Sequence, residues 1–184
     1  MFSTRIFIIW TIWITIISCK VTGQKNQPNV VLILTDDLDL LQGGMNPLNK
    51  TRNLIGDAGI TFENSFVSTP ICCPSRSSIL TGKYQHNTRV YNNTVVGGCN
   101  SEYWRNELEP QSISTTAQEY GYETYYAGKY LNQYGFEKTG GPEHIPKGWN
   151  HWYGLSLVII SILYQSDIIY IYLYICIFIY LYSW

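Results

Sequence analysis

Residues 72–83 read Cys-Cys-Pro-Ser-Arg-Ser-Ser-Ile-Leu-Thr-Gly-Lys, and this run indicates more about the chain than any other stretch. Pro74 suits the first turn of a helix and Gly82 suits its end, so we expect a helix between them. Cys72 then lies at the helix N-terminus, where backbone N–H groups and the helix dipole favour negative charge. Arg76, one turn further on, can reach the same place. The run therefore predicts a site that holds an anion beside a cysteine-derived group.

Apolar segments on either side of this run predict the fold. Residues 29–34 are continuously apolar, which is typical of a parallel strand buried on both faces. Residues 60–67 alternate between apolar and polar and predict a second strand, and residues 123–127 predict a third. Helices are expected over residues 51–58 and 112–120, because each is followed by a glycine. Strands that alternate with helices indicate an α/β fold with a mainly parallel sheet.

Charged side chains follow two of these predicted strands. Asp36 and Asp37 come directly after residues 29–34, and Lys129 comes after residues 123–127. Ligands of parallel sheets bind at the carboxyl ends of the strands. Two carboxylates there suit a hard divalent cation such as Ca²⁺ or Mg²⁺. An isolated pair of aspartates is also common in turns and helix caps.

Three motifs resemble those of the sulfatase family. The first is the pattern Cys72-x-Pro-Ser-Arg with its Thr-Gly-Lys continuation, which resembles the sulfatase signature. Residues 127–130, Ala-Gly-Lys-Tyr, resemble the second signature of the family. Residues 148–153, Gly-Trp-Asn-His-Trp-Tyr, resemble the branch that acts on 6-sulfated glucosamine. The resemblance spans about residues 29–155 and implies the N-terminal part of an alkaline-phosphatase-like α/β sulfatase fold, truncated.

The resemblance implies a specific chemistry. Cys72 would be converted to formylglycine by the formylglycine-generating enzyme, and its hydrate would attack the sulfur of a sulfate ester. The second hydroxyl of the hydrate would then release sulfate. Asp36 and Asp37 match two metal ligands of the family, which with Cys72 would hold Ca²⁺ rather than Mg²⁺, and Arg76 would steady the hydrate. The implied substrate is the 6-sulfate of N-acetylglucosamine in glycosaminoglycans such as heparan and keratan sulfate.

The resemblance also suggests roles for residues outside the cation site. Lys129 matches a lysine that contacts the sulfate oxygens, and Lys83 matches one that points toward formylglycine. Leu131 stands where many family members have a histidine, so His86 becomes a candidate general acid. Asn132 is a candidate for substrate binding. Each of these residue types is also common on an ordinary exposed surface.

The N-terminus predicts entry into the secretory pathway. Residues 1–23 resemble a signal peptide, with Arg5 followed by an apolar run over residues 6–18. A retained anchor is the alternative, although this run is shorter than the ~20 residues needed to span a membrane. Asn49 and Asn92 begin glycosylation sequons. A lysosomal or extracellular location is therefore expected.

Composition sets further bounds. The chain has 184 residues and a formal net charge of -1, which is the size of one domain and carries no basic stripe for nucleic acid. Its five cysteines lack metal-finger spacing. The adjacent pair Cys72 and Cys73 as a redox disulfide is the weakest alternative, because adjacent cysteines close only a strained ring.

The C-terminal residues 156–184 differ from the rest of the chain. They are rich in Ile and Tyr and carry one charge, Asp167. Residues 168–184 are marginally long enough for a membrane helix but lack flanking Lys or Arg, so an aberrant or read-through tail is the preferred interpretation. No further metal ligands of the family are found there, which predicts little activity. A non-catalytic, membrane-tethered protein that binds sulfated glycans is the alternative function.

Overall fold

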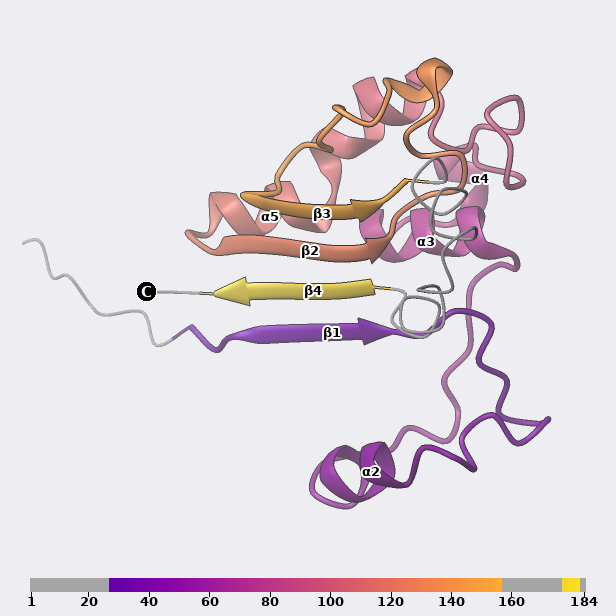
Figure 1. Ribbon diagram of the computed structural model, residues 1–184, viewed down its shortest axis with the longest axis vertical. Helices are drawn as coiled ribbons and strands as arrows, with labels where there is room; N and C mark the ends of the chain where they lie inside the picture. The colour runs from indigo at the N-terminus through magenta and orange to yellow at the C-terminus, as the bar shows by residue number, and fades with distance from the viewer. Residues whose placement is uncertain (1–26, 157–176, 183–184) are drawn as a thin grey trace, which may run out of the picture.

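A four-stranded sheet organises the computed structural model, which describes residues 27–156 and 177–182 (Figure 1). The strands lie in the order β1-β4-β2-β3. They are β1 (Val30–Leu34), β2 (Glu123–Lys129), β3 (His151–Leu155) and β4 (Ile177–Tyr182). β2 and β3 are parallel, and β4 is antiparallel to both β1 and β2. β1, β2 and β3 therefore run in one direction, which confirms the expected α/β sheet.

Helices and helical turns connect the strands. In Figure 1, α3 and α5 lie with β2 and β3, whereas α2 lies apart from the sheet. The helices are α2 (Asn49–Thr51), α3 (Cys72–Thr81), α4 (Gln85–Thr88) and α5 (Ile113–Glu119), with π-helical turns η1 (Arg52–Gly56) and η2 (Trp104–Leu108) and 3₁₀ turns η3 (Glu109–Gln111) and η4 (Glu137–Thr139). The helices expected over residues 51–58, between Pro74 and Gly82, and over residues 112–120 are thus present, with ends shifted by a few residues.

An aromatic cluster forms the core beside β2 and β3. Trp104 and Tyr126 are fully buried, and Tyr126 stacks on Trp152 with ring centroids 4.5 Å apart. Tyr130 packs edge-on against Trp152 at 5.1 Å, and its hydroxyl accepts a hydrogen bond of 2.9 Å from Trp104 Nε1. These stacked and edge-on arrangements are the favoured ones for aromatic pairs. The cluster fixes the carboxyl end of β2, where Lys129 lies.

β1 is less buried than its apolar sequence predicts. Leu32 and Leu34 are partly buried and pack against the core, whereas Val31 and Ile33 are 51% and 56% exposed. The prediction of burial on both faces was therefore wrong. β1 is an edge strand of the sheet. Among the described residues, nothing covers the face of the sheet that carries Val31 and Ile33.

The strand predicted over residues 60–67 does not form. These residues are irregular and exposed throughout, with Phe62 at 77% and Phe66 at 87% exposure. An alternating pattern stabilises a strand only when a neighbouring strand pairs with it. Within residues 27–156 and 177–182, no strand lies beside this segment.

The only disulfide among the described residues joins Cys73 to Cys99. Cys72 remains a free thiol of intermediate exposure. The Cys72–Cys73 redox pair is therefore excluded in this structure. The disulfide closes a loop with a sequence separation of 26, which stabilises the fold by about 3 kcal/mol in the chain-entropy account.

The apolar tail contributes a strand to the sheet. Ile177–Tyr182 forms β4, and Leu181 is 5% exposed within the core. A membrane helix over residues 168–184 is thus contradicted where the structure describes them. In the described residues, no helix has the length and apolarity to cross a membrane. The predicted signal peptide, residues 1–23, and residues 157–176 lie outside the described part.

Candidate active site

α3 presents Cys72 at its first turn. Ile71, the residue before the helix, is extended, and its carbonyl accepts the first helical hydrogen bond from Ser75 N at 3.0 Å. The backbone N–H of Cys73 donates to Asn93 Oδ1 at 2.9 Å. Gly82 ends the helix in the left-handed conformation, with φ of 67°. The expected helix boundaries are confirmed.

The two aspartates converge because β1 has already ended. β1 stops at Leu34, and residues 36 and 37 form a bend. Asp37 has a φ of 50°, a left-handed conformation that aspartate tolerates better than most residues. Successive residues of a strand face opposite sides, but this bend brings both carboxylates toward Cys72. Ligand atoms of Asp36, Asp37 and Cys72 all lie within 4.8 Å of one another.

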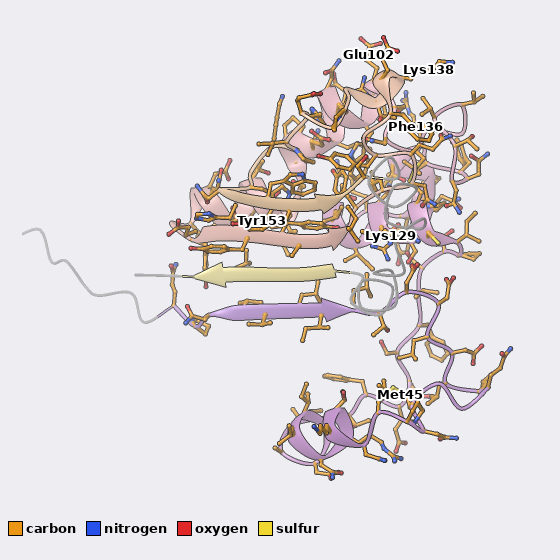
Figure 2. The ribbon with its side chains drawn as sticks, viewed as in Figure 1. Met45, Glu102, Lys129, Phe136, Lys138 and Tyr153 are labelled. Carbon is orange, nitrogen blue, oxygen red and sulfur yellow. A yellow bond between two sulfur atoms is a disulfide. The ribbon has the colours of Figure 1, made fainter. Side chains whose placement is uncertain are left out.

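Asp36 forms ion pairs with two positively charged side chains, those of Arg76 and Lys129. Its Oδ1 accepts from Arg76 Nη2 at 2.8 Å, and its Oδ2 accepts from Lys129 Nζ at 2.7 Å. Arg76 Nη1 also donates to the carbonyl oxygen of Lys129 at 2.6 Å. Figure 2 labels Lys129 at the end of β2. Residues from α3, from β2 and from the bend after β1 thus meet at the carboxyl ends of β1 and β2.

The pKa of Asp36 is set by opposing effects. Partial burial on its own would raise this pKa, but hydrogen bonds and charge attraction from Lys129 and Arg76 outweigh it. The net pKa of Asp36 lies below its ordinary value. Asp36 therefore stays ionised at neutral pH, and it neutralises Arg76, whose side chain is only 3% exposed.

The cluster fits a hard divalent cation in part. Asp36 and Asp37 offer carboxylate oxygens, the ligands that Ca²⁺ and Mg²⁺ prefer. The thiol of Cys72 is a soft ligand, so the third position suits such a cation only after sulfur is replaced by oxygen. Ca²⁺ takes 6–8 oxygen ligands. Asp36 and Asp37 alone therefore predict weak binding, with water or substrate filling the other positions.

The structure does not bring Lys83 or His86 to this cluster. Lys83 follows the opposite end of α3 from Cys72, and its Nζ donates to Gln111 Oε1 at 2.5 Å. His86 is exposed in α4 and stacks on Tyr84 with ring centroids 5.9 Å apart. The sequence motif places Lys83 eleven residues after Cys72, but it does not determine where the lysine side chain points. In the structure, this side chain points to Gln111.

The other histidines are engaged elsewhere. His144 Nε2 lies 3.0 Å from the buried carboxylate of Glu109, and His151 Nε2 lies 2.7 Å from Glu123. No histidine of the described residues therefore reaches the Cys72 cluster through a direct contact. A general acid is not assigned in this part of the chain.

Asn132 lies beside the disulfide that holds the α3 N-terminus. Its carbonyl oxygen is 3.3 Å from Cys99 Sγ, and its side-chain Oδ1 is buried without a hydrogen-bond partner. Sequence analysis missed Cys99 and Asn93, the two residues that tie the following loop to α3. Nothing in a Tyr- and Asn-rich loop predicts which asparagine caps the helix.

The structure thus places two carboxylates, two cationic side chains and a helix N-terminal cysteine at the carboxyl ends of β1 and β2, where the ligands of α/β sheets bind. Comparison with known proteins identifies the family. The sequence profile described as Sulfatase matches residues 28–170. This chain belongs to the sulfatase family, and the resemblance of its motifs is confirmed.

Similar individual proteins support the same family assignment. Human N-acetylglucosamine-6-sulfatase is 52% identical over 136 residues, which is 73% of this chain and 25% of that protein. The goat protein of the same name is 52% identical over 132 residues, 71% of this chain and 24% of its own length. The extracellular sulfatase SULF-1 homolog of Drosophila melanogaster is 41% identical over 134 residues, 73% of this chain and 11% of its own. No solved structure matches. The chain spans about a quarter of the length of the first two relatives.

Proposed function

We propose that this chain carries the nucleophile half of a sulfatase site that hydrolyses the 6-sulfate of N-acetylglucosamine in glycosaminoglycans. The observation that carries the proposal is the convergence of Asp36, Asp37 and Cys72 within 4.8 Å, with Arg76 and Lys129 bound to Asp36. Identity to N-acetylglucosamine-6-sulfatases over most of the chain supports the substrate.

Each side chain of the cluster has a defined task in this proposal. Arg76 holds Asp36 in place through its planar guanidinium, which pairs with carboxylates in fixed geometry. Lys129, with its side chain 26% exposed, can turn donors toward the oxygens of an incoming sulfate while it stays near Asp36. Cys72 marks the position from which the nucleophile is made. Its place at the N-terminus of α3 favours the negative charge that builds up on sulfate.

The cation of this site would be Ca²⁺ held by Asp36 and Asp37. When bound, it lowers the pKa of an oxygen nucleophile and offsets the charge of the sulfate. The formal negative charges of Asp36 and Asp37 balance the formal positive charges of Arg76 and Lys129. A divalent cation therefore makes the cluster net positive, which favours an anionic ester. Asp37 is exposed on a bend, which suits the flexible coordination of Ca²⁺ better than the strict octahedron of Mg²⁺.

The oxidation state of Cys72 tests the proposal directly. Co-expression with the formylglycine-generating enzyme, the proposed processing partner, should convert Cys72 and leave the Cys73–Cys99 disulfide intact. Mass spectrometry of the Cys72 peptide would show the thiol replaced by an aldehyde. An unconverted thiol would count against the proposed nucleophile.

A sulfate-release assay on the converted protein tests its level of activity. Because Asp36 and Asp37 are the only carboxylates of the described cluster, we expect slow turnover of N-acetylglucosamine-6-sulfate. Turnover comparable to that of a full-length N-acetylglucosamine-6-sulfatase would contradict the expected weak site.

The chain would act as a glycoprotein of the secretory pathway, in lysosomes or outside the cell. The predicted signal peptide supports this, as does the name of the Drosophila relative, an extracellular sulfatase homolog. Asn92 is exposed, and Thr94 Oγ1 donates to Asn92 Oδ1 at 2.7 Å within the sequon. Asn49 is also exposed. A shift in gel mobility after removal of N-linked glycans would test both sites.

The alternative is a membrane-tethered protein that binds sulfated glycans without turnover. Arg76 and Lys129 beside Asp36 support it, because a site with these two cationic side chains could bind an anion without turnover. Its tether is less well supported, since Ile177–Tyr182 forms a strand. Release of the protein from membranes by carbonate would exclude it.

A further inference from the structure

A cavity lies along α3, outside the Cys72 cluster. Its volume is about 500 Å³, within the range of ligand pockets. Ser75, Ser78 and Ile79 of α3 line one side, and Lys83 lies at its end. Ser75 is one helical turn after Cys72, so the cavity begins next to the proposed reaction site. It runs along the helix toward Lys83.

The lining combines the groups that bind an anionic sugar. Phe66 and Tyr84 expose 87% and 65% of their surface, and aromatic faces pack against the apolar face of a sugar ring. Ser75 and Ser78 add small polar side chains to the same wall.

Lys83 supplies the charge. Its Nζ donates to Gln111 Oε1 at 2.5 Å, which leaves two of the three ammonium donors for a ligand. α3 has ten residues, so its ends are about 15 Å apart. Lys83 is therefore too distant from Cys72 to contact the sulfate that reacts there. It can contact an anionic group on another sugar of the same chain.

We infer that this cavity, the α3 groove, is a subsite for the neighbouring sugars of a sulfated glycosaminoglycan, with Lys83 binding a sulfate or carboxylate on one of them. The inference rests on the proposed function, because the groove extends from the proposed reaction site. It adds that the protein favours an oligosaccharide over a single sulfated sugar. It also gives Lys83 a role different from the one its motif suggests.

Binding measurements test the groove separately from the reaction site. Calorimetry on the full chain with Cys72→Ala, in Ca²⁺, would compare N-acetylglucosamine-6-sulfate with a sulfated glycosaminoglycan tetrasaccharide. We expect tighter binding of the tetrasaccharide. Lys83→Gln should weaken that binding about tenfold, the effect of one charged hydrogen bond, and leave the monosaccharide unchanged. Lys138→Gln is the matched control, since Lys138 is exposed on another part of the molecule (Figure 2).

The outcomes separate the two hypotheses. Equal tetrasaccharide affinity for Lys83→Gln and the parent would overturn the groove. Tetrasaccharide binding that depends on Lys83, without any monosaccharide binding, would support the groove and count against the proposed reaction site.

Two further measurements identify the contacts inside the groove. Tyr84→Ala should weaken binding of the tetrasaccharide and leave binding of the monosaccharide unchanged. Unchanged tetrasaccharide affinity would show that Tyr84 makes no contact with the sugar. A tetrasaccharide desulfated next to the reacting sugar distinguishes the anion: retained dependence on Lys83 identifies a carboxylate, and lost dependence identifies a sulfate.

Discussion

Residues 72–155 and residues 30–67 belong to one family match but are packed very differently. In the first region, Trp104 and Tyr126 are fully buried and a disulfide anchors α3. In the second, Leu41 is 96% exposed and Phe66 is 87% exposed. Both regions contain apolar segments in the sequence. The difference shows that an apolar pattern stabilises the fold only where another element covers it.

Core truncation should separate the two regions most strongly. Trp104→Ala removes a ring that is fully buried, and we expect the free energy of unfolding to fall by about 3–5 kcal/mol. Phe66→Ala, in the second region, should change it by less than about 0.5 kcal/mol. Urea unfolding followed by circular dichroism would measure both. Equal losses would show that Phe66 is packed in solution.

Loss of the disulfide should have the next largest effect on stability. Cys99→Ser should lower the free energy of unfolding by about 3 kcal/mol, because it opens the loop back to Cys73. Cys72→Ser is the matched control, since Cys72 is not bonded, and should leave stability nearly unchanged. Thermal melts with and without reductant would test this. A control variant as unstable as Cys99→Ser would contradict the assigned pairing.

Asp36 links the two regions, so its removal should cost stability and cation binding together. Asp36→Asn leaves the buried Arg76 without its carboxylate. We expect a loss of about 2 kcal/mol, less than for a fully buried pair because the Asp36 side chain is 24% exposed. Calcium titration should show no binding. Asp39→Asn, an exposed aspartate nearby, should retain both properties.

The smallest expected effect is the difference in acid stability between the parent protein and Asp36→Asn. The pKa of Asp36 is lower in the folded protein than its ordinary value near 3.9, so the ion pairs stabilise the fold above that pH. This stability is lost as the pH falls through the folded pKa. The parent should therefore lose more stability than Asp36→Asn between about pH 5 and pH 2. Parallel acid-dependence curves would contradict the lowered pKa.

The sequence predicted the elements that carry strong local signals. The helix from Cys72 to Gly82 has helix-compatible residues and a glycine end, and β2 was placed within two residues of its bounds. The cluster of Asp36, Arg76 and Lys129 was also expected, because its members follow strands or share a helix turn.

Long-range pairing could not be predicted in the same way. The segment 60–67 has a strand pattern but no partner strand among the described residues, and Ile177–Tyr182 pairs with residues of β1 and β2 at least 49 positions earlier in the chain. The positions of Lys83 and His86 depend on how their side chains turn after α3. A sequence motif therefore predicts neither the pairing of distant strands nor the direction of these two side chains.

The strand order has one more consequence, for the width of the site. Asp36 follows β1 and Lys129 ends β2, yet β4 lies between these two strands, so the strands are two spacings, or about 9.5 Å, apart. The 2.7 Å contact between these side chains therefore spans the end of a third strand. Only a long side chain can close that distance. The strand order thus requires a side chain at position 129 that is as long as lysine as well as positively charged.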